Sequence, residues 1–182
     1  MGNRFASGKN SIAQCDRCDQ RFKLKQLKRE VIKGRNFYFT LHHATPGPVT
    51  VKLAGVTVGG MADHNGNATV MIPASPYGIF SATATSGAET ATTKVYVPSF
   101  SLRNSDGEIV YAGRRGHFLT LRVEYIKFGT VVSVLSGNQL TSRAAWTTSV
   151  AKVTFRVPNF AGPASILVNL AGQNKVIKYW VK

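Results

Sequence analysis

The 182-residue sequence contains few acidic residues. Only 8 Asp and Glu stand against 23 Lys and Arg, which gives a formal net charge of +15 and a pI of about 10.3. This shortage of negative charge favours a polyanionic partner or an acidic protein surface. Residues 1–35 hold 10 basic and 3 acidic residues, residues 36–97 hold 2 of each, and residues 98–182 hold 11 and 3. A neutral middle therefore separates two basic ends.

Cysteine is also scarce, and long apolar runs are missing. The two cysteines, Cys15 and Cys18, lie three positions apart, which excludes the disulfide framework of a small secreted domain. No run approaches the roughly 18 apolar residues of a membrane span. The first 30 residues are polar and basic, without the apolar segment of a secretory signal. We therefore expect a protein made in a reducing cytoplasm and not placed in a membrane.

Signals of catalysis are lacking as well. The carboxylates are isolated or lie in turns, and Asp106 and Glu108 fit a solvated hairpin tip better than a catalytic pair. The sequence has no Gly-rich phosphate loop and no Gly-x-Ser-x-Gly elbow. His64 and His117 stand alone and fit surface or packed positions better than general bases. We expect a protein that is not an enzyme.

Residues 1–14 read as an extended basic arm without a core of its own. Residues 21–33 form the one good helix candidate, because Leu24, Leu27 and Val31 follow i, i+3, i+7 spacing. Lysine and arginine occupy much of the opposite face, and Gly34 is a suitable stop. This basic face is open to two interpretations: a solvated surface, or a binding surface for phosphates or a partner.

Residues 15–43 contain the pattern of a metal site. Cys-x-x-Cys places two thiolates on one tight turn, as a tetrahedral metal requires, and the chain returns with His42 and His43. The pattern predicts one structural zinc on Cys15, Cys18, His42 and a further group. Two free thiols on a segment packed against a neighbour are the alternative.

The rest of the chain is rich in Thr, Val and turn signals, which predicts a mainly β fold. Pro46-Gly47-Pro48 reads as a linker, and Val97-Pro98-Ser99 as a border between two β-sandwiches, 46–97 and 98–182. One joined β-domain is the alternative. Asn65-Gly66 predicts a hairpin turn, with residues 68–73 as the returning strand.

Two short patterns resemble known immunoglobulin-like families. The Asp63-His64-Asn65-Gly66-Asn67-Ala68 step resembles bacterial immunoglobulin-like repeats. In the second block, the strand Phe118-Leu119-Thr120-Leu121, Val157-Pro158 and Gly162 before Ile166-Leu167-Val168 resemble the IPT/TIG type. The resemblance implies two immunoglobulin-like β-sandwiches and says little about function.

Residues 2–45 resemble the N-terminal zinc-ribbon module of small structural proteins of tailed bacteriophages. The resemblance rests on Gly2-Asn3-Arg4-Phe5-Ala6-Ser7-Gly8-Lys9, Cys15-Asp16-Arg17-Cys18 and Phe22-Lys23-Leu24-Lys25-Gln26-Leu27-Lys28. It implies a zinc-ribbon-like anchor module over 15–45 with Cys15, Cys18 and His42 as ligands. Thr45 stands where the family has its last cysteine, and the adjacent His43 could supply the fourth ligand.

The resemblance implies a virion component, either a capsid decoration or a neck or tail protein, assembled in the host cytoplasm in multiple symmetric copies. Its partners would be capsid or neck/tail subunits, with contact to packaged DNA if the arm reaches the interior. The expected binding residues are basic or aromatic: Arg4, Phe5, Lys9, Arg21, Lys23, Lys25, Lys28 and Arg29. The alternatives are a nucleic-acid-binding accessory protein using the same basic head, and a carbohydrate-binding module suggested only by the fold.

Overall fold

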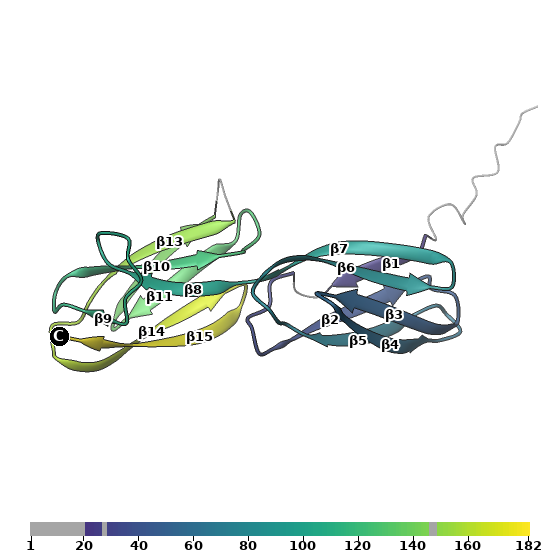
Figure 1. The fold of residues 1–182 in the computed structure, drawn as a ribbon, viewed down its shortest axis with the longest axis horizontal. Helices are drawn as coiled ribbons and strands as arrows, with labels where there is room; N and C mark the ends of the chain where they lie inside the picture. The colour runs from purple at the N-terminus through teal and green to yellow at the C-terminus, as the bar shows by residue number, and fades with distance from the viewer. Residues whose placement is uncertain (1–20, 27–28, 146–148) are drawn as a thin grey trace, which may run out of the picture.

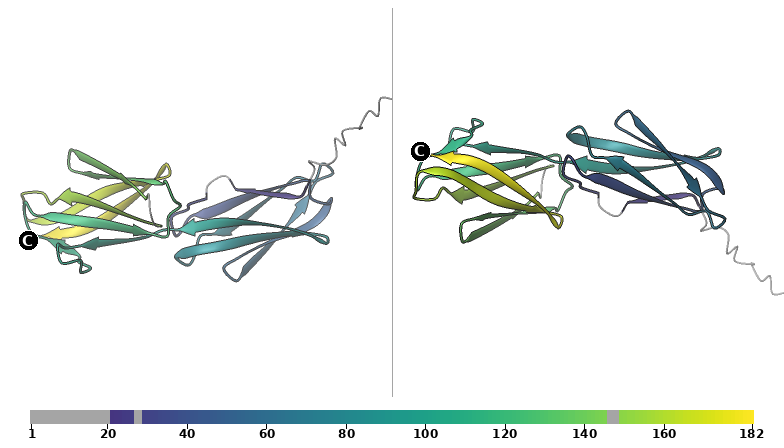
Figure 2. Two further views of the ribbon diagram at one scale, coloured as in Figure 1. Left: turned by 90° about the horizontal axis from the view of Figure 1, so that it is seen from above. Right: turned by 90° about the horizontal axis from the view of Figure 1, so that it is seen from below.

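The computed structural model describes residues 21–26, 29–145 and 149–182, and these residues form strands and no helix (Figure 1). The described part therefore contains no helix that could cross a membrane. The strands build two β-sandwiches placed end to end, and Figure 2 shows the two layers of each.

The first sandwich has seven strands in two antiparallel sheets. One sheet has the order β1-β2-β5 and the other has the order β4-β3-β6-β7. In immunoglobulin letters these sheets are A-B-E and C′-C-F-G, which is an immunoglobulin-like topology. The strands are β1 (Lys23–Gln26), β2 (Asn36–His42), β3 (Gly47–Leu53), β4 (Val56–Ala62), β5 (Ala68–Pro73), β6 (Gly78–Ser86) and β7 (Glu89–Val97).

The second sandwich repeats this plan. Its sheets have the orders β13-β10-β8 and β12-β11-β14-β15-β9, which correspond to E-B-A and C′-C-F-G-A′. The short β9 pairs parallel with β15, so a segment near the start of the domain closes the edge beside its last strand. The strands are β8 (Ser99–Arg103), β9 (Ala112–Gly113), β10 (Phe118–Glu124), β11 (Val131–Ser136), β12 (Gln139–Ala144), β13 (Val150–Arg156), β14 (Gly162–Leu170) and β15 (Gln173–Val181).

Each sandwich buries its own core through alternation along the strands. In β2, Phe37, Phe39 and Leu41 are fully buried, whereas Tyr38 between them is 47% exposed. In β10, Leu121 and Val123 are fully buried in the same way. The two cores are separate clusters of apolar side chains. The prediction of a mainly β protein with immunoglobulin-like sandwiches is therefore confirmed.

The helix predicted over residues 21–33 is wrong for its described residues. Residues 23–26 form β1, which pairs antiparallel with β2. The buried Phe22 and the half-buried Leu24 follow the period of two expected of a strand, with exposed lysines on either side of Leu24. The i, i+3, i+7 spacing that predicted a helix is accidental here, because pairing to a strand that is already buried decides the local structure.

The described part of the predicted anchor module does not stand apart from the first sandwich. β1 and β2 form one of its sheets together with β5, and Phe22 and Val31 join its core. The predicted linker at 46–48 is also wrong, because Gly47 and Pro48 begin β3. Since Val97 ends β7, this sandwich takes its strands from 23–97.

The turn at Asn65-Gly66 exists, but it does not close the predicted hairpin. It joins β4 to β5, which lie in different sheets, and β5 pairs with β2. Gly66 has a φ of 74°, and its carbonyl oxygen accepts a hydrogen bond from the Ala44 amide at 3.0 Å. The chain therefore crosses from one layer to the other at this turn.

The junction between the sandwiches is short and polar. Pro98 is the one residue between β7 and β8, and it is buried. Glu30 is buried at the junction, with 5% of its surface exposed. Its Oε1 accepts hydrogen bonds from the Lys127 amide at 2.5 Å and from the Thr130 hydroxyl at 2.6 Å. Glu30 belongs to the first sandwich, and both donors belong to the second.

A second buried residue, Gln173 at the start of β15, completes this junction. Its Nε2 donates to the Glu30 carbonyl oxygen at 2.6 Å, and its Oε1 accepts from the Ile32 amide at 3.3 Å. A buried polar group is strongly destabilising when it loses its partners, so these bonds favour one relative orientation of the two domains. The two sandwiches therefore form an end-to-end rod with a hydrogen-bonded junction (Figure 1).

Candidate binding surfaces

The predicted metal ligands fall partly outside the described residues. Cys15 and Cys18 lie there, and among the described residues no three His, Cys, Asp or Glu gather as a metal site. His42 ends β2, and its Nδ1 lies 3.0 Å from the Asn67 Oδ1. When Nδ1 donates this bond, Nε2 is the nitrogen left for a ligand, as is common for metal-binding histidines. His43 follows with a φ of 58° and an exposed side chain.

The predicted basic binding residues that the structure describes lie on or beside a strand and not on a helix. Arg4, Phe5, Lys9 and Lys28 lie outside the described residues. Arg21, Lys23, Lys25 and Arg29 are exposed, and the two lysines flank Leu24 on β1. β1 is the edge strand of its sheet, and charged lysines on such a strand oppose edge-to-edge pairing. This structural role explains Lys23 and Lys25 without a ligand.

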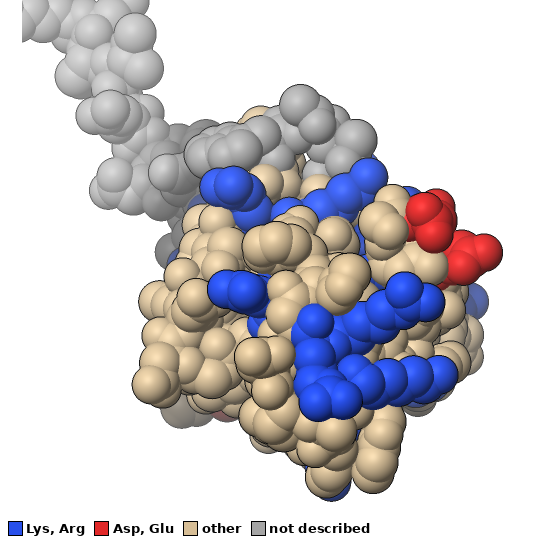
Figure 3. All heavy atoms as spheres, turned by 90° about the vertical axis from the view of Figure 1, so that its left-hand side faces the viewer, with Lys and Arg blue, Asp and Glu red and all other residues tan. Residues whose placement is uncertain are grey.

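The far end of the second sandwich carries a basic surface that contains none of the predicted binding residues. We call Arg114, Arg115, Arg156 and Lys182 the distal basic surface. All four residues are exposed, and Figure 3 shows Lys and Arg gathered over this end of the molecule. A hollow of about 450 Å³ beside them includes Arg114, His117 and Lys182 in its lining. The dipeptide Arg114-Arg115 before Gly116 was the one sequence signal of this surface.

The turn that presents these cations is held by hydrogen bonds from both neighbours. The Arg115 amide donates to the Lys182 carbonyl oxygen at 3.2 Å, and the Gly116 amide donates to the Val157 carbonyl oxygen at 3.3 Å. Arg156 Nε donates to the Gly116 carbonyl oxygen at 3.2 Å. These bonds hold the backbone of the turn and the Arg156 side chain, so the basic residues are presented together at one end, which suits them for phosphates or carboxylates.

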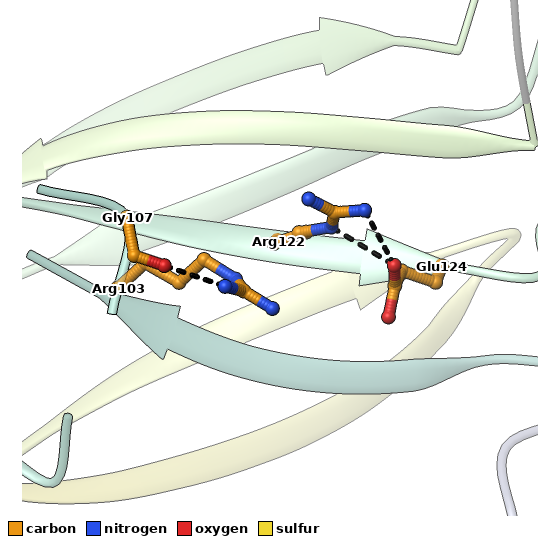
Figure 4. A network of polar contacts seen from close by, with 4 residues as sticks. All are labelled: Arg103, Gly107, Arg122 and Glu124. Atoms are coloured by element: carbon orange, nitrogen blue, oxygen red, sulfur yellow. Dashed lines mark hydrogen bonds and ion pairs between the residues drawn. The ribbon is translucent and has the colours of Figure 1, made fainter. Parts of the chain in front are cut away.

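Two further arginines on the three-stranded sheet of this sandwich are used internally (Figure 4). The Arg122 guanidinium binds the Glu124 Oε1 through Nη2 at 2.7 Å and Nε at 2.9 Å. Arg103 Nη1 donates to the Gly107 carbonyl oxygen at 2.5 Å, whereas its Nε is buried without a partner among the described residues. Both guanidinium groups are therefore bonded within this sandwich.

An aromatic groove of about 650 Å³ lies at the same end. Its walls include Pro158, Phe160, Pro163 and Trp180, and the two aromatic residues are each 53% exposed. Tyr179, beside Trp180 on β15, is 5% exposed, and burial raises the pKa of its phenol.

The nearby Ser136 hydroxyl lowers the pKa of Tyr179 and so offsets part of this rise. The proton of the Ser136 hydroxyl is itself donated to the Arg156 carbonyl oxygen at 3.2 Å. The buried phenol oxygen of Tyr179 has no hydrogen-bond partner among the described residues.

The junction also concentrates positive charge. Burial lowers the pKa of Lys175, and the charge of Lys33 lowers it further. The Lys175 ammonium lies 4.8 Å from the centre of the Phe100 ring, and Arg35 Nη2 donates to the Asn174 carbonyl oxygen at 3.2 Å. The repulsion between Lys33 and Lys175 opposes the contacts made by Glu30 and Gln173, whereas the Arg35 bond adds to them.

No family model and no curated protein matches the chain. Among solved structures, a C-terminal intimin fragment in complex with the translocated intimin receptor is similar at 15% identity and a TM-score of 0.44, over 86% of this chain and 62% of that one.

Two bacterial adhesins are similar at the same level. The Escherichia coli adhesin FdeC matches at 15% identity and a TM-score of 0.37, over 90% of this chain and 64% of that one. The Yersinia pseudotuberculosis adhesin InvE matches at 11% identity and a TM-score of 0.36, over 88% and 58%. This chain spans less than two thirds of each of these structures.

Proposed function

We propose that this chain is a non-enzymatic structural protein that binds other proteins, anchored through its basic N-terminal segment and projecting two immunoglobulin-like sandwiches as a stiff arm. The particular assembly we propose is the virion of a tailed phage, as a capsid decoration or a neck or tail component in several symmetric copies. The resemblance of residues 2–45 to phage structural proteins supports this choice. Weak single contacts would then add up through avidity.

The observation that carries the proposal is the junction. A one-residue linker and the buried pair Glu30 and Gln173 favour one orientation of the second sandwich relative to the first. Stiff spacing between an anchor and an outer domain suits a scaffold, because it holds the outer surface away from the point of attachment at low entropic cost.

Immunogold electron microscopy of intact phage particles tests the proposal. Label scattered over the head would indicate a decoration protein, and label at one vertex or along the tail would indicate a neck or tail component. The absence of label, together with absence of the protein from disrupted particles, would refute the virion assignment.

A truncation tests the anchor separately. Because residues 21–45 contribute strands to the first sandwich, the deletion must stop at residue 20. A chain of residues 21–182 retains every described strand, so we expect it to fold and to lose attachment to particles. Attachment as strong as that of the full chain would show that residues 1–20 are not the anchor.

Nucleic-acid binding is the second candidate, and the distal basic surface favours it. A DNA-binding chain should lose affinity steeply as salt rises, with a slope set by the number of phosphates it neutralises. The double variant Arg114→Ala/Arg115→Ala should then flatten that slope, whereas Lys52→Ala/Lys94→Ala on the first sandwich serves as the control. Particle attachment that persists at salt concentrations which strip the free chain from DNA would favour the structural role.

One structural zinc on Cys15, Cys18, His42 and His43 remains part of the proposal. Elemental analysis of protein purified under reducing conditions with zinc supplied should find about one zinc per chain. The variant Cys15→Ser/Cys18→Ser should lose it while the sandwiches stay folded by circular dichroism. Zinc-free wild-type protein would remove the metal from the proposal.

A further inference from the structure

The two sandwiches contain hairpins of identical length and register, which allows a residue-by-residue comparison. β6 pairs with β7 from Gly78 opposite Val97 to Ser86 opposite Glu89. β14 pairs with β15 in the same way, from Gly162 opposite Val181 to Leu170 opposite Gln173. The hairpins β3–β4 and β11–β12 also match, because each closes with two residues between its last paired positions. Outward-facing positions on β11, β12, β14 and β15 therefore have equivalents on β3, β4, β6 and β7.

One row of outward-facing residues differs completely between the two sheets. In the second sandwich, neighbouring strands place four apolar side chains opposite one another, and we call these the apolar row: Leu140, Leu135, Leu167 and Val176, exposed by 70%, 37%, 37% and 56%. The equivalent row of the first sandwich is polar throughout: Thr57, Lys52, Thr83 and Thr92.

The apolar row is not needed for the fold. The inner faces of β11, β14 and β15 already supply a closed core, including Val134, Ile166 and Val168 with no exposure, and the row does not contribute to it. A sheet with one solvated face normally shows polar residues on that face, as the equivalent row of the first sandwich does. Four apolar side chains opposite one another on four neighbouring strands are therefore an exposed patch of the kind that marks an interaction site.

The charge next to the row indicates what kind of partner fits. Lys178 is exposed on the same face of β15, between Val176 and Trp180 in the alternation, and it lies directly opposite Ser165. A partner that covers this face would bury the ammonium, and a buried ammonium requires a carboxylate. The strands β11, β12, β14 and β15 contain no Asp or Glu.

We propose that the outer face formed by the apolar row and Lys178 docks a different protein, which presents apolar side chains around a carboxylate. A second copy of this chain fits poorly, because two such faces in contact would bring lysines together without any carboxylate. The inference deepens the proposed binding role, on which it rests, by assigning the face and the chemistry of the partner.

The first sandwich supplies a matched control within the same chain. Lys94 lies opposite Ser81 at the positions equivalent to Lys178 and Ser165, but the row beside Lys94 is polar. Lys94→Glu therefore makes the same charge reversal on the same fold without touching the proposed face. A row variant that copies the first sandwich, Leu135→Thr/Leu140→Thr/Leu167→Thr/Val176→Thr, removes the apolar contacts alone.

The test uses a random peptide display library selected on the full-length chain, followed by affinity measurement of the selected peptides. We expect peptides rich in large apolar residues with at least one Asp or Glu. Their affinity should fall about 10-fold or more on the row variant and on Lys178→Glu, and stay unchanged on Lys94→Glu. A peptide with Lys in place of its acidic residue should bind Lys178→Glu better than the wild-type chain. Thermal unfolding of each variant checks that the fold is retained.

Several results would overturn this inference. These are no enrichment of any peptide, selected peptides without acidic residues, or binding that survives the row variant. Self-association of the wild-type chain in sedimentation, abolished in the row variant, would instead identify a second copy as the occupant. The assay needs no particle, so its failure would leave the immunogold result standing, and a failed particle result would leave the peptide result standing.

Discussion

Replacing Glu30 tests whether the rod is stiff. Glu30→Ala removes both hydrogen bonds that its carboxylate accepts from the second sandwich, from the Lys127 amide and the Thr130 hydroxyl. Hydrogen bonds to a charged group contribute roughly 1.5–3 kcal/mol each, so we expect the junction to lose about 3 kcal/mol. Glu30→Gln keeps an acceptor of the same shape without its charge and should lose about half of that.

Hydrogen exchange and X-ray scattering measure the consequence. A loss of about 3 kcal/mol corresponds to a drop of roughly 100-fold in the protection of the Lys127 amide. Small-angle scattering should show a broader range of interdomain angles for Glu30→Ala. Glu89→Ala, an exposed glutamate at the β6–β7 turn, is the control and should behave as the wild type. Unchanged Lys127 protection and unchanged scattering in Glu30→Ala would refute the account of the junction.

Three further substitutions probe stability, each with its own measurement. Tyr179→Phe removes a buried phenol oxygen that lacks a partner among the described residues, so urea unfolding should show equal or greater stability, by up to about 1 kcal/mol; a clear loss would reveal a partner. Because the pKa of Lys175 is lowered in the folded chain, the unfolded chain binds more protons between that lowered pKa and 10.5. The free energy of unfolding should therefore rise with pH across this window. Unfolding measured as a function of pH should show no such rise in Lys175→Met. In Gly66→Ala the new Cβ would lie 2.5 Å from the Ala44 carbonyl oxygen, and the backbone φ is 74°, so the thermal midpoint should fall by the equivalent of about 2 kcal/mol or more. Gly172 has the same φ with open space around it, so the control variant Gly172→Ala should lose only about 1 kcal/mol of stability.

The β-rich character and the two immunoglobulin-like sandwiches could be predicted because the evidence for them is local. Alternating Thr and Val segments between glycine turns predict strands, and the register of pairs such as Ser86 with Glu89 follows from short turns. The row of Leu140, Leu135, Leu167 and Val176 could not be recognised in advance. It exists only once four strands are aligned, and each residue alone is an ordinary apolar position in a strand.

The errors at the N-terminal end have a different physical cause. The segment around Leu24 satisfies helical and extended spacing equally well over a few residues. Which one forms depends on the buried β2, whose residues Phe37 and Phe39 offer an edge for pairing. The Asn65-Gly66 turn was recognised, but a turn signal does not reveal whether its two strands share a sheet. The predicted metal site stays a prediction, because Cys15 and Cys18 lie outside the described residues.

The parallel pairing of β9 with β15 has a mechanical consequence. In an antiparallel hairpin pulled at its open end, the hydrogen bonds break one after another. Consider tension along the rod that is applied at Ser99 and at Lys182. This tension would shear β9 against β15, because the two strands are parallel. Two hydrogen bonds would then bear the load together: Trp180 N to Tyr111 O and Lys182 N to Gly113 O. The same pairing that closes the edge of the sheet therefore acts as a clamp against being pulled apart.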